Sequence, residues 1–369
     1  SFAAAPLSVS EGTGFVRLTV TRSGDLSLPA RVDYATSGGT ADDRADFTAA
    51  YGTLRFAADE TTRTLDVFVT DDRFAEGPES FTVALSNAAG VTLGAAPTAT
   101  VHLLDHDAAT GANPVRWDAG VDTQFFVRQH YVDFFNREPD AAGLAHWTNV
   151  IESCGADNLC REARRVNVSA AFVLSIEFQE TGFVVYLAHQ AAFETAERLR
   201  LKDFLADVRE IGRGVVVNQG DWKGQIESNR TAFFDEFVTR PAFASKFGAL
   251  SNVQYVDALN AGAGNSLTQG ERDALVAGLN AATLTRARAL RSVVENPAFG
   301  RSHYNRAFVL MQYFGSLRRN PDDAPEQNRD FAGFNHWLTN LNNFNGNFEQ
   351  AEMVKAFITS EEYQRRFGP

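Results

Sequence analysis

The segment Phe15-Val-Arg-Leu-Thr-Val-Thr-Arg22 alternates apolar and polar side chains along its whole length. Such alternation is typical of a β-strand that turns one face toward a core. The same pattern recurs at residues 65–69, 81–85 and 101–103, and Gly, Asn, Asp and Ser separate the runs. Strands at roughly 10–15-residue spacing predict a two-sheet antiparallel β-sandwich of seven strands over residues 1–107.

Acidic residues concentrate where these predicted strands end. Residues 1–112 carry 15 Asp and Glu against 7 Arg and no Lys, so they hold −8 of the chain's net charge of −12. Strand ends from distant positions meet at one pole of a sandwich, and calcium binds roughly six to eight oxygen ligands at once. We therefore expect a calcium site at this pole, with the alternative that these acids are ordinary turn residues.

Several motifs in this part resemble the Calx-beta family and follow its motif order. They include Ser8-Val-Ser-Glu-Gly-Thr-Gly14, Tyr51-Gly-Thr-Leu-Arg-Phe56, Glu76-Gly-Pro-Glu79 and Leu104-Asp-His-Asp107. The resemblance implies an immunoglobulin-like sandwich, which in some members binds calcium at one pole. It carries the metal-ligand role onto the acids that match the family motif: Glu11, Asp46, Asp71, Asp72, Glu76, Asp105 and Asp107. Two departures, Arg44-Ala45 in place of a glycine and His106 in place of an aspartate, are expected to reduce affinity.

The apolar period changes after a linker-like stretch. Residues 108–120 include Ala108-Ala-Thr-Gly-Ala-Asn-Pro114, which has linker composition. From residue 121 to 369 the apolar residues follow a helical period, with long helices expected near 161–193 and 268–295. We predict a multidomain β + α protein whose C-terminal region, 121–369, is all-α.

The helical region contains an internal repeat. The segment from Tyr131 to Trp147 matches the segment from Met311 to Trp337 through Arg-x-Pro-Asp followed by Gly-x-x-His-Trp, and the second copy has an insertion at roughly 323–330. The repeated parts span about 125–190 and 305–367. We expect repeated helix pairs, in which Asp140 and Asp322 cap the following helices.

A second motif recurs four times in the helical region. Each copy places two apolar residues, mostly aromatic, around a Ser, Thr or Pro, at residues 172–178, 237–243, 294–299 and 357–363. This pattern predicts that one helix ends and the next begins at each position.

The chain has only two cysteines, Cys154 and Cys160. A zinc site would need further Cys or His ligands at suitable spacing nearby. We interpret the pair as a local disulfide that closes a short loop, with a reduced pair as the alternative. A disulfide would indicate an oxidising compartment.

The helical part also resembles a bacterial domain family of unknown function. The resemblance rests on Arg137-Glu-Pro-Asp-Ala-Ala-Gly-Leu144 with Trp147, and on Ser175-Ile-Glu-Phe-Gln-Glu-Thr-Gly182. That family occurs in large secreted or surface proteins, so the resemblance implies a secreted or cell-surface location in a bacterium. It implies an all-helical fold and no reaction.

Sequence motifs of catalysis are missing. The chain has no Gly-x-Ser-x-Gly, no His-Glu-x-x-His and no phosphate-binding Gly-x-x-x-x-Gly-Lys, so we assign no catalytic residue. Its acidity argues against nucleic acid as a partner, and no apolar run reaches the roughly 18 residues of a membrane span.

The function hypothesis is a non-enzymatic extracellular protein, stabilised by calcium, that serves as a repeating subunit of a surface layer or fibre. Its partners would be further copies of itself or other surface proteins. The alternatives are an adhesin-type module that binds glycan or protein, and a hydrolase. Exposed aromatic residues in a groove would favour binding, buried ones would favour a scaffold, and an acid pair across a deep cleft would favour the hydrolase.

Overall fold

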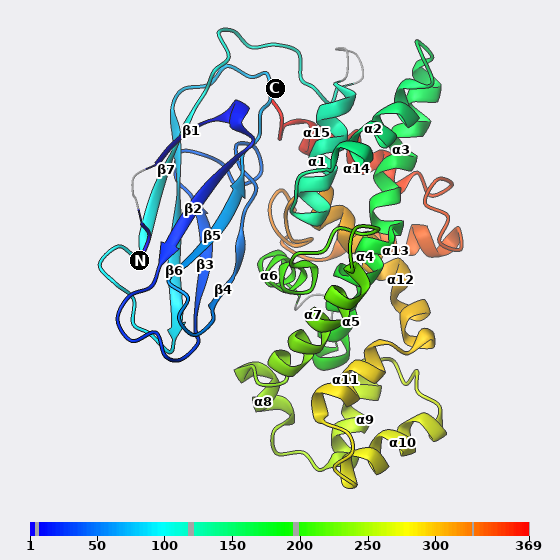
Figure 1. The fold of residues 1–369 in the computed structure, drawn as a ribbon. Helices are drawn as coiled ribbons and strands as arrows, with labels where there is room; N and C mark the ends of the chain where they lie inside the picture. The colour runs from blue at the N-terminus through cyan, green and yellow to red at the C-terminus, as the bar shows by residue number, and fades with distance from the viewer. Residues whose placement is uncertain (4–6, 117–121, 195–198, 327, 369) are drawn as a thin grey trace. The chain divides into compact units, whose positions relative to one another are not determined.

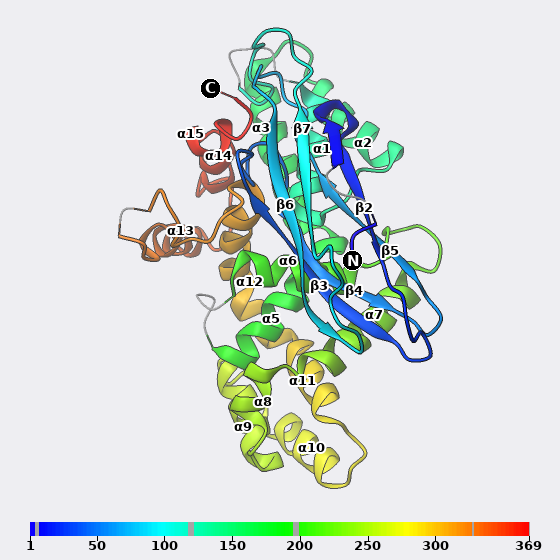
Figure 2. The same ribbon diagram turned by 90° about the vertical axis from the view of Figure 1, so that its left-hand side faces the viewer.

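The computed structural model describes residues 1–3, 7–116, 122–194, 199–326 and 328–368. In this part of the chain the N-terminal region contains the strands β1 (Leu7–Ser10), β2 (Phe15–Thr21), β3 (Ala30–Gly38), β4 (Tyr51–Phe56), β5 (Thr62–Phe68), β6 (Glu79–Ala89) and β7 (Thr98–Leu104). They form a five-stranded sheet in the order β1-β7-β6-β3-β4 and a two-stranded sheet of β2 and β5 (Figures 1 and 2). The predicted two-sheet β-domain is confirmed.

One strand pair departs from the expected antiparallel pattern. Strand β1 runs parallel to β7, with Ser10 opposite Leu104. A parallel pair needs a long connection, and here the whole domain lies between the two strands. The side chains of Leu7 and Val9 pack against the core from this position.

The core lies between the two sheets. The predicted inward residues of β2 are buried, at Val16, Leu18 and Val20. Burying an aliphatic side chain of this size contributes about 1.5–3 kcal/mol. Phe47, in the β3–β4 connection, stacks on Phe81 with ring centroids 4.2 Å apart, so this connection is anchored in the core.

Helices follow the β-domain. Those before residue 250 are α1 (Thr123–Phe135), α2 (Ala141–Glu152), α3 (Asn158–Leu174), α4 (Ile176–Glu180), α5 (Gly182–Phe193), α6 (Leu201–Gly212), α7 (Trp222–Phe237) and α8 (Pro241–Phe247). Those after it are α9 (Asn252–Gly262), α10 (Gln269–Asn280), α11 (Arg286–Val294), α12 (Pro297–Met311) with the π-helical turn η3 (Gln312–Ser316), α13 (Ala332–Asn343), α14 (Met353–Ile358) and α15 (Glu361–Gln364).

Contacts divide the chain into two compact units. Unit 1 combines Ser1–Ala170, Gly315–Arg318 and Val354–Pro369, while unit 2 combines Ala171–Phe314 and Arg319–Met353. The predicted division into residues 1–107, 108–120 and 121–369 follows secondary-structure type. The division by contacts differs from it, because unit 1 combines the β-domain with α1, α2 and the C-terminal segment.

The buried ion pair of Asp133 joins distant segments of unit 1. Arg366 donates from Nη1 and Nη2 to the two carboxylate oxygens of Asp133, at 2.8 and 2.9 Å, and both side chains are almost fully buried. The same guanidinium donates to the carbonyl oxygens of Ser316 and Arg44. Removing one partner of such a pair costs about 3–5 kcal/mol, because a buried charge is left without its partner.

Of the described part of the predicted linker, residues 108–112 are exposed, whereas residues 113–115 are buried within unit 1. Asn113 Nδ2 donates to the carbonyl oxygens of Gln364 and Gly368, and the carbonyl of buried Val115 accepts from Arg165 Nη2. Residues 117–120 of the predicted linker lie outside the described residues.

The four predicted helix junctions are confirmed. Each repeated motif coincides with the end of one helix and the start of the next: α3 to α4, α7 to α8, α11 to α12, and α14 to α15. Ser175, Asn296 and Ser360 each accept a hydrogen bond from the first turn of the new helix, and Pro241 and Pro297 occupy first helical positions. The helix expected to be continuous near 161–193 is therefore interrupted at the first of these junctions. The one expected near 268–295 is also interrupted, but by residues 281–285 between α10 and α11, where no such motif lies.

The sequence repeat corresponds to a repeated local structure. The Arg137 guanidinium lies 4.9 Å from the Tyr131 ring centroid, and Arg319 lies 5.1 Å from that of Tyr313. Each arginine also donates from Nη1 to the carbonyl of the residue after it, at 3.0 Å. In each copy the tyrosine hydroxyl lies against the glycine of the Gly-x-x-His-Trp motif, Gly143 or Gly333, where a Cβ atom would collide with it.

One expected helix cap is wrong. Asp140 caps α2 by accepting from Gly143 N at 3.0 Å, as predicted. Asp322 does not cap α13; its carboxylate pairs with Arg200 at 2.7 Å. The insertion in the second copy separates Asp322 from the helix start, and Asp330 accepts from Ala332 N instead.

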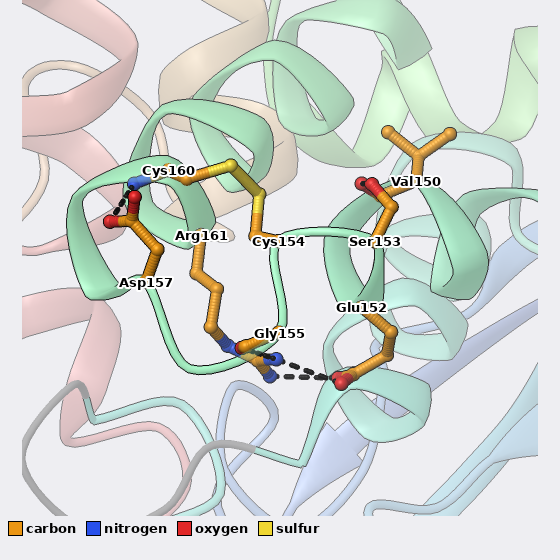
Figure 3. Close-up of a disulfide and its surroundings, with 8 residues drawn as sticks. All are labelled: Val150, Glu152, Ser153, Cys154, Gly155, Asp157, Cys160 and Arg161. Carbon is orange, nitrogen blue, oxygen red and sulfur yellow. Dashed lines mark hydrogen bonds and ion pairs between the residues drawn. A yellow bond between two sulfur atoms is a disulfide. The ribbon is translucent and has the colours of Figure 1, made fainter.

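The structure joins Cys154 and Cys160 in a disulfide between α2 and α3 (Figure 3). The surrounding loop is fixed further by Asp157, which accepts from Cys160 N, and by Arg161, which donates to both oxygens of Glu152. That contact with Arg161, aided by Thr123, lowers the pKa of Glu152 to about 2. Closing a loop this short removes conformational entropy from the unfolded chain, which raises its free energy by about 2 kcal/mol.

Among the described residues, no single helix has the length and hydropathy of a membrane span. The helical segments Asn158–Glu180 and Gly182–Phe193, which meet at a bend of 70°, have the length and hydropathy of a span only when they are taken together.

The repeat makes a testable prediction at its glycines. Alanine normally stabilises a helix interior relative to glycine by up to about 1 kcal/mol. We expect Gly143→Ala and Gly333→Ala to destabilise by about 1–3 kcal/mol instead, because the methyl group meets Tyr131 or Tyr313. Gly270→Ala in α10, where nothing lies within 4 Å, is the matched control and should be neutral or stabilising. Chemical denaturation measures all three, and an equal response at the three positions would contradict this explanation.

Candidate metal centre

Strand register brings the acidic connections together at one end of the β-domain. Because β1 and β7 run parallel and Ser10 lies opposite Leu104, Glu11 and Asp105 leave the sheet side by side. Strand β6 runs antiparallel to β7 with Glu79 opposite Leu103, so β6 begins where β7 ends. The bridge between Phe47 and Val69 brings the connection that holds Asp46 next to the connection that holds Asp71 and Asp72. We call this end of the domain the carboxylate pole.

Two groups of donors lie at the carboxylate pole. In the first, the His106 group, ligand atoms of Glu11, Asp105, His106 and Asp107 all lie within 4.8 Å of one another. In the second, the Asp46 group, oxygens of Asp46, Glu76 and Glu79 meet the same limit. Glu11 interacts electrostatically with Asp105, Asp72, Glu76 and Asp46, so the two groups share one electrostatic environment.

The electrostatics of the pole favour protonation in the absence of a cation. Burial, followed by the neighbouring carboxylates, raises the pKa of Glu11 to about 8, of Asp72 to about 6 and of Glu76 to about 7. Burial and the contact with Asp46 raise the pKa of Glu79 to about 8. Like charges this close cannot all ionise without a compensating positive charge.

Backbone amides hold some of these carboxylates in place. Asp105 accepts from Asp107 N through Oδ1 at 2.6 Å and from Glu76 N through Oδ2 at 2.5 Å. Asp46 Oδ2 accepts from Asp42 N at 2.6 Å, and Asp72 Oδ1 accepts from Phe74 N at 2.7 Å. The loops are therefore shaped by the same side chains that would bind an ion.

Other oxygens at the pole remain without a hydrogen-bond donor. Among the described residues, Asp107 Oδ2 and Glu79 Oε2 are buried and have no hydrogen-bond partner. A buried acceptor without a donor costs about 1–3 kcal/mol, and more when it is charged. Carboxylate oxygens are the ligands that calcium prefers, so this donor set fits a calcium ion.

The structure places the seven predicted ligands as follows. Glu11, Asp105 and Asp107 lie in the His106 group, and Asp46 and Glu76 lie in the Asp46 group. The remaining two, Asp72 and Asp71, belong to neither group. Asp72 acts electrostatically on Glu11 and Glu76, whereas Asp71 lies at the rim, with 42% of its side chain exposed and Oδ1 3.6 Å from His106 Nε2.

Two residues of the groups, Glu79 and His106, are absent from the predicted set. Glu79 is the first residue of β6 and shares its face with the buried Phe81 and Val83, so strand alternation alone could have pointed it inward. His106 lies between two predicted ligands, and the resemblance treats it only as a departure from aspartate. Its place among the donors depends on the register of β1 and β7, which the sequence does not give.

Besides the 3.8 Å ion pair of Arg44 with Glu362, three shorter contacts between described residues fasten the connections of the pole to the helical part of unit 1. Arg128 of α1 donates to the carbonyl of Gly14, which ends the 3-10 turn η1 (Glu11–Thr13), and pairs with Glu138. Arg73 pairs at 2.8 Å with Asp122, the N-cap of α1. The third contact is the hydrogen bond from Arg366 Nε to the carbonyl of Arg44 at 3.1 Å.

The raised pKa values predict how metal-free stability depends on pH. Because folded Glu11, Glu76 and Glu79 hold protons that the unfolded chain releases near pH 4.5, each loses stabilisation as pH rises through its folded pKa. Buried His130 has the opposite effect, but only below about pH 6.5, since its pKa is lowered to about 4. Between pH 6.5 and 8.5 in chelator we therefore expect the thermal midpoint of unfolding to fall by several degrees. Calcium should abolish the fall, and a metal-free midpoint that rises over this interval would contradict the prediction.

Comparisons with known proteins agree with this organisation. Residues 1–107 match the model of the Calx-beta domain family, and residues 115–182 match that of the domain of unknown function DUF4214. The sodium/calcium exchanger Calx of Drosophila melanogaster is 37% identical over 103 residues, which cover 28% of this chain and 11% of that protein. Sodium/calcium exchanger 1 of Mus musculus is 41% identical over 78 residues, covering 21% of this chain and 8% of that protein.

Solved structures of the Calx protein are also similar to part of this chain. The crystal structure of calcium binding domain CBD12 of CALX1.1 is 36% identical, covers 29% of this chain and 45% of its own, and gives a TM-score of 0.28. That of the apo-form Calx CBD1 domain is 36% identical, covers 29% of this chain and 95% of its own, and also gives 0.28. The matched segment spans about a tenth of the length of the exchangers. This chain therefore carries a Calx-beta domain at residues 1–107, followed by a DUF4214 domain at residues 115–182.

Proposed function

We propose that the carboxylate pole binds calcium and that the ion stabilises unit 1. The observation that carries this proposal is the pair of buried, unpartnered oxygens, Asp107 Oδ2 and Glu79 Oε2, within a cluster of carboxylates. Two unit charges 4 Å apart interact by about 4 kcal/mol at an effective dielectric constant of 20, so a divalent ion would reverse a large repulsion. The match to the Calx-beta family supports the same ion.

The effect of the ion would extend beyond the β-domain. The connections that hold Glu11 and Asp46 are the ones that Arg128 and Arg366 contact. Neutralising the pole would fix these connections and, with them, the hydrogen bonds to α1 and to the C-terminal segment. An ion that binds only the folded state at 100 times its dissociation constant adds about 2.7 kcal/mol of stability.

The wider role we propose is that of a non-enzymatic structural protein of the bacterial surface or extracellular space. The aromatic residues of the helical region support a scaffold over a binding groove, since Phe344 alone among the aromatics of the described residues is exposed, at 40%. The Cys154–Cys160 disulfide is consistent with an oxidising compartment. Its partners would be copies of itself or other surface proteins.

A calorimetric titration of the metal-free chain with calcium tests the site. We expect binding, together with a thermal midpoint several degrees higher than in chelator. Glu79→Gln keeps the shape of the side chain but removes a carboxylate of the Asp46 group from the cluster. It should raise the metal-free midpoint, because repulsion falls, and weaken calcium binding at least about tenfold.

Asp59→Asn is the matched control. Asp59 is exposed in the turn between β4 and β5, at the other end of those strands from the carboxylate pole, and asparagine accepts its positive φ of 64°. This variant removes one negative charge and should leave calcium binding unchanged. Equal loss in both variants, or identical unfolding of the parent chain with and without calcium, would contradict the proposed site.

Light scattering tests the proposed assembly. If the chain is a subunit of a layer or fibre, particles larger than the 40.4 kDa monomer should form in calcium as protein concentration rises. A monomer at every concentration, with calcium bound, would contradict self-association and leave the calcium site intact.

A further inference from the structure

The two donor groups at the carboxylate pole differ in chemistry. The Asp46 group offers only carboxylate oxygens, whereas the His106 group combines the imidazole of His106 with the carboxylates of Glu11, Asp105 and Asp107. Calcium is a hard cation that prefers oxygen, and imidazole suits zinc and other first-row transition ions. The pole thus presents one group suited to a hard ion and one suited to a borderline ion.

Two neighbours lie beside the His106 ring. A Cβ atom added at Gly12 would lie 3.5 Å from His106 Nε2, so the ring lies against the 3-10 turn that begins with Glu11. Asp71 Oδ1 lies 3.6 Å from the same nitrogen. This separation is longer than a hydrogen bond, so Asp71 is a neighbouring negative charge that does not fix the orientation of the ring.

Independent observations indicate that the His106 group is built for a ligand. Glu11 is 5% exposed although it carries a carboxylate, and Asp107 Oδ2 is buried without a hydrogen-bond partner among the described residues. His106 itself is about half exposed, so an ion can reach the group from solvent. A buried carboxylate, two half-buried carboxylates and an accessible imidazole form a mixed nitrogen and oxygen donor set that zinc accepts.

We infer that the His106 group binds a zinc-class divalent ion through His106, Glu11, Asp105 and Asp107, beside a calcium ion held by Asp46, Glu76 and Glu79. This inference rests on the proposed calcium site and adds the identity of the second ion. It also explains why a histidine occupies position 106. The imidazole would weaken the binding of a second calcium at the His106 group and strengthen the binding of a transition ion. The protein would then respond to two different metals through one end of the β-domain.

Cobalt(II), a spectroscopic substitute for zinc, provides the first test. The full chain in saturating calcium is titrated with cobalt chloride, and the visible absorption bands report nitrogen ligation. We expect saturable bands in the parent chain, and their loss in His106→Ala. His146→Ala, which removes an exposed helical histidine of the DUF4214 domain, is the matched control and should leave the bands unchanged.

Zinc titration by calorimetry in calcium gives the affinities. Loss of the imidazole should weaken zinc binding by at least about tenfold in His106→Ala, while the rise in thermal midpoint caused by calcium persists and shows that the variant is folded. His106→Asp should strengthen calcium binding and still lack the cobalt bands.

Equal zinc affinity in the parent chain and in His106→Ala would overturn the inference, as would cobalt bands that survive in that variant. Both results leave the calcium site intact when calcium still raises the midpoint. Absence of the calcium response in the parent chain overturns the proposed function instead, so the two failures are distinguishable.

Discussion

Repulsion between carboxylates at the ends of strands is the physical constraint on which unit 1 depends. The register of β1 with β7, and of β6 with β7, forces Glu11, Asp105 and Glu79 to one end of the domain. Burial then raises the cost of their charges, which is why the pKa values of Glu11 and Glu79 rise to about 8. The fold alone therefore gathers carboxylates whose joint ionisation is unfavourable without a compensating positive charge.

The position of this pole explains why one ion could affect more than its own loops. Gly14, Arg44 and Arg73 lie in three of the connections at the pole, and each contacts the helical part of unit 1. Arg366, which contacts Arg44, also belongs to the buried ion pair with Asp133 of α1. A change in the geometry of the connections would thus affect α1 and the C-terminal segment through these hydrogen bonds and this ion pair.

Sequence patterns predicted the structural elements that depend on interactions between residues close together in the chain. Alternation indicated the strands at residues 15–22, 65–69, 81–85 and 101–103, and Ser, Thr or Pro between apolar residues indicated the helix junctions. Both patterns depend on neighbours within a few residues. The parallel pairing of β1 with β7 and the loss of the Asp322 cap depend on register and on an inserted segment, which no local pattern contains. For the same reason the ligand list from the sequence includes Asp71 at the rim and omits His106. Glu79 is a different case, because the alternation of β6 already pointed it inward.

Hydrogen–deuterium exchange of the whole chain, with and without calcium, shows whether an ion at the carboxylate pole stabilises unit 1 as a whole. We expect calcium to slow exchange in the connections at residues 42–46 and 71–76, and also in α1 and α15, while α9 and α10 of unit 2 stay unchanged as an internal reference. Slower exchange confined to the connections of the β-domain would contradict the claim that the ion stabilises unit 1 as a whole, and no change anywhere would contradict the metal centre itself.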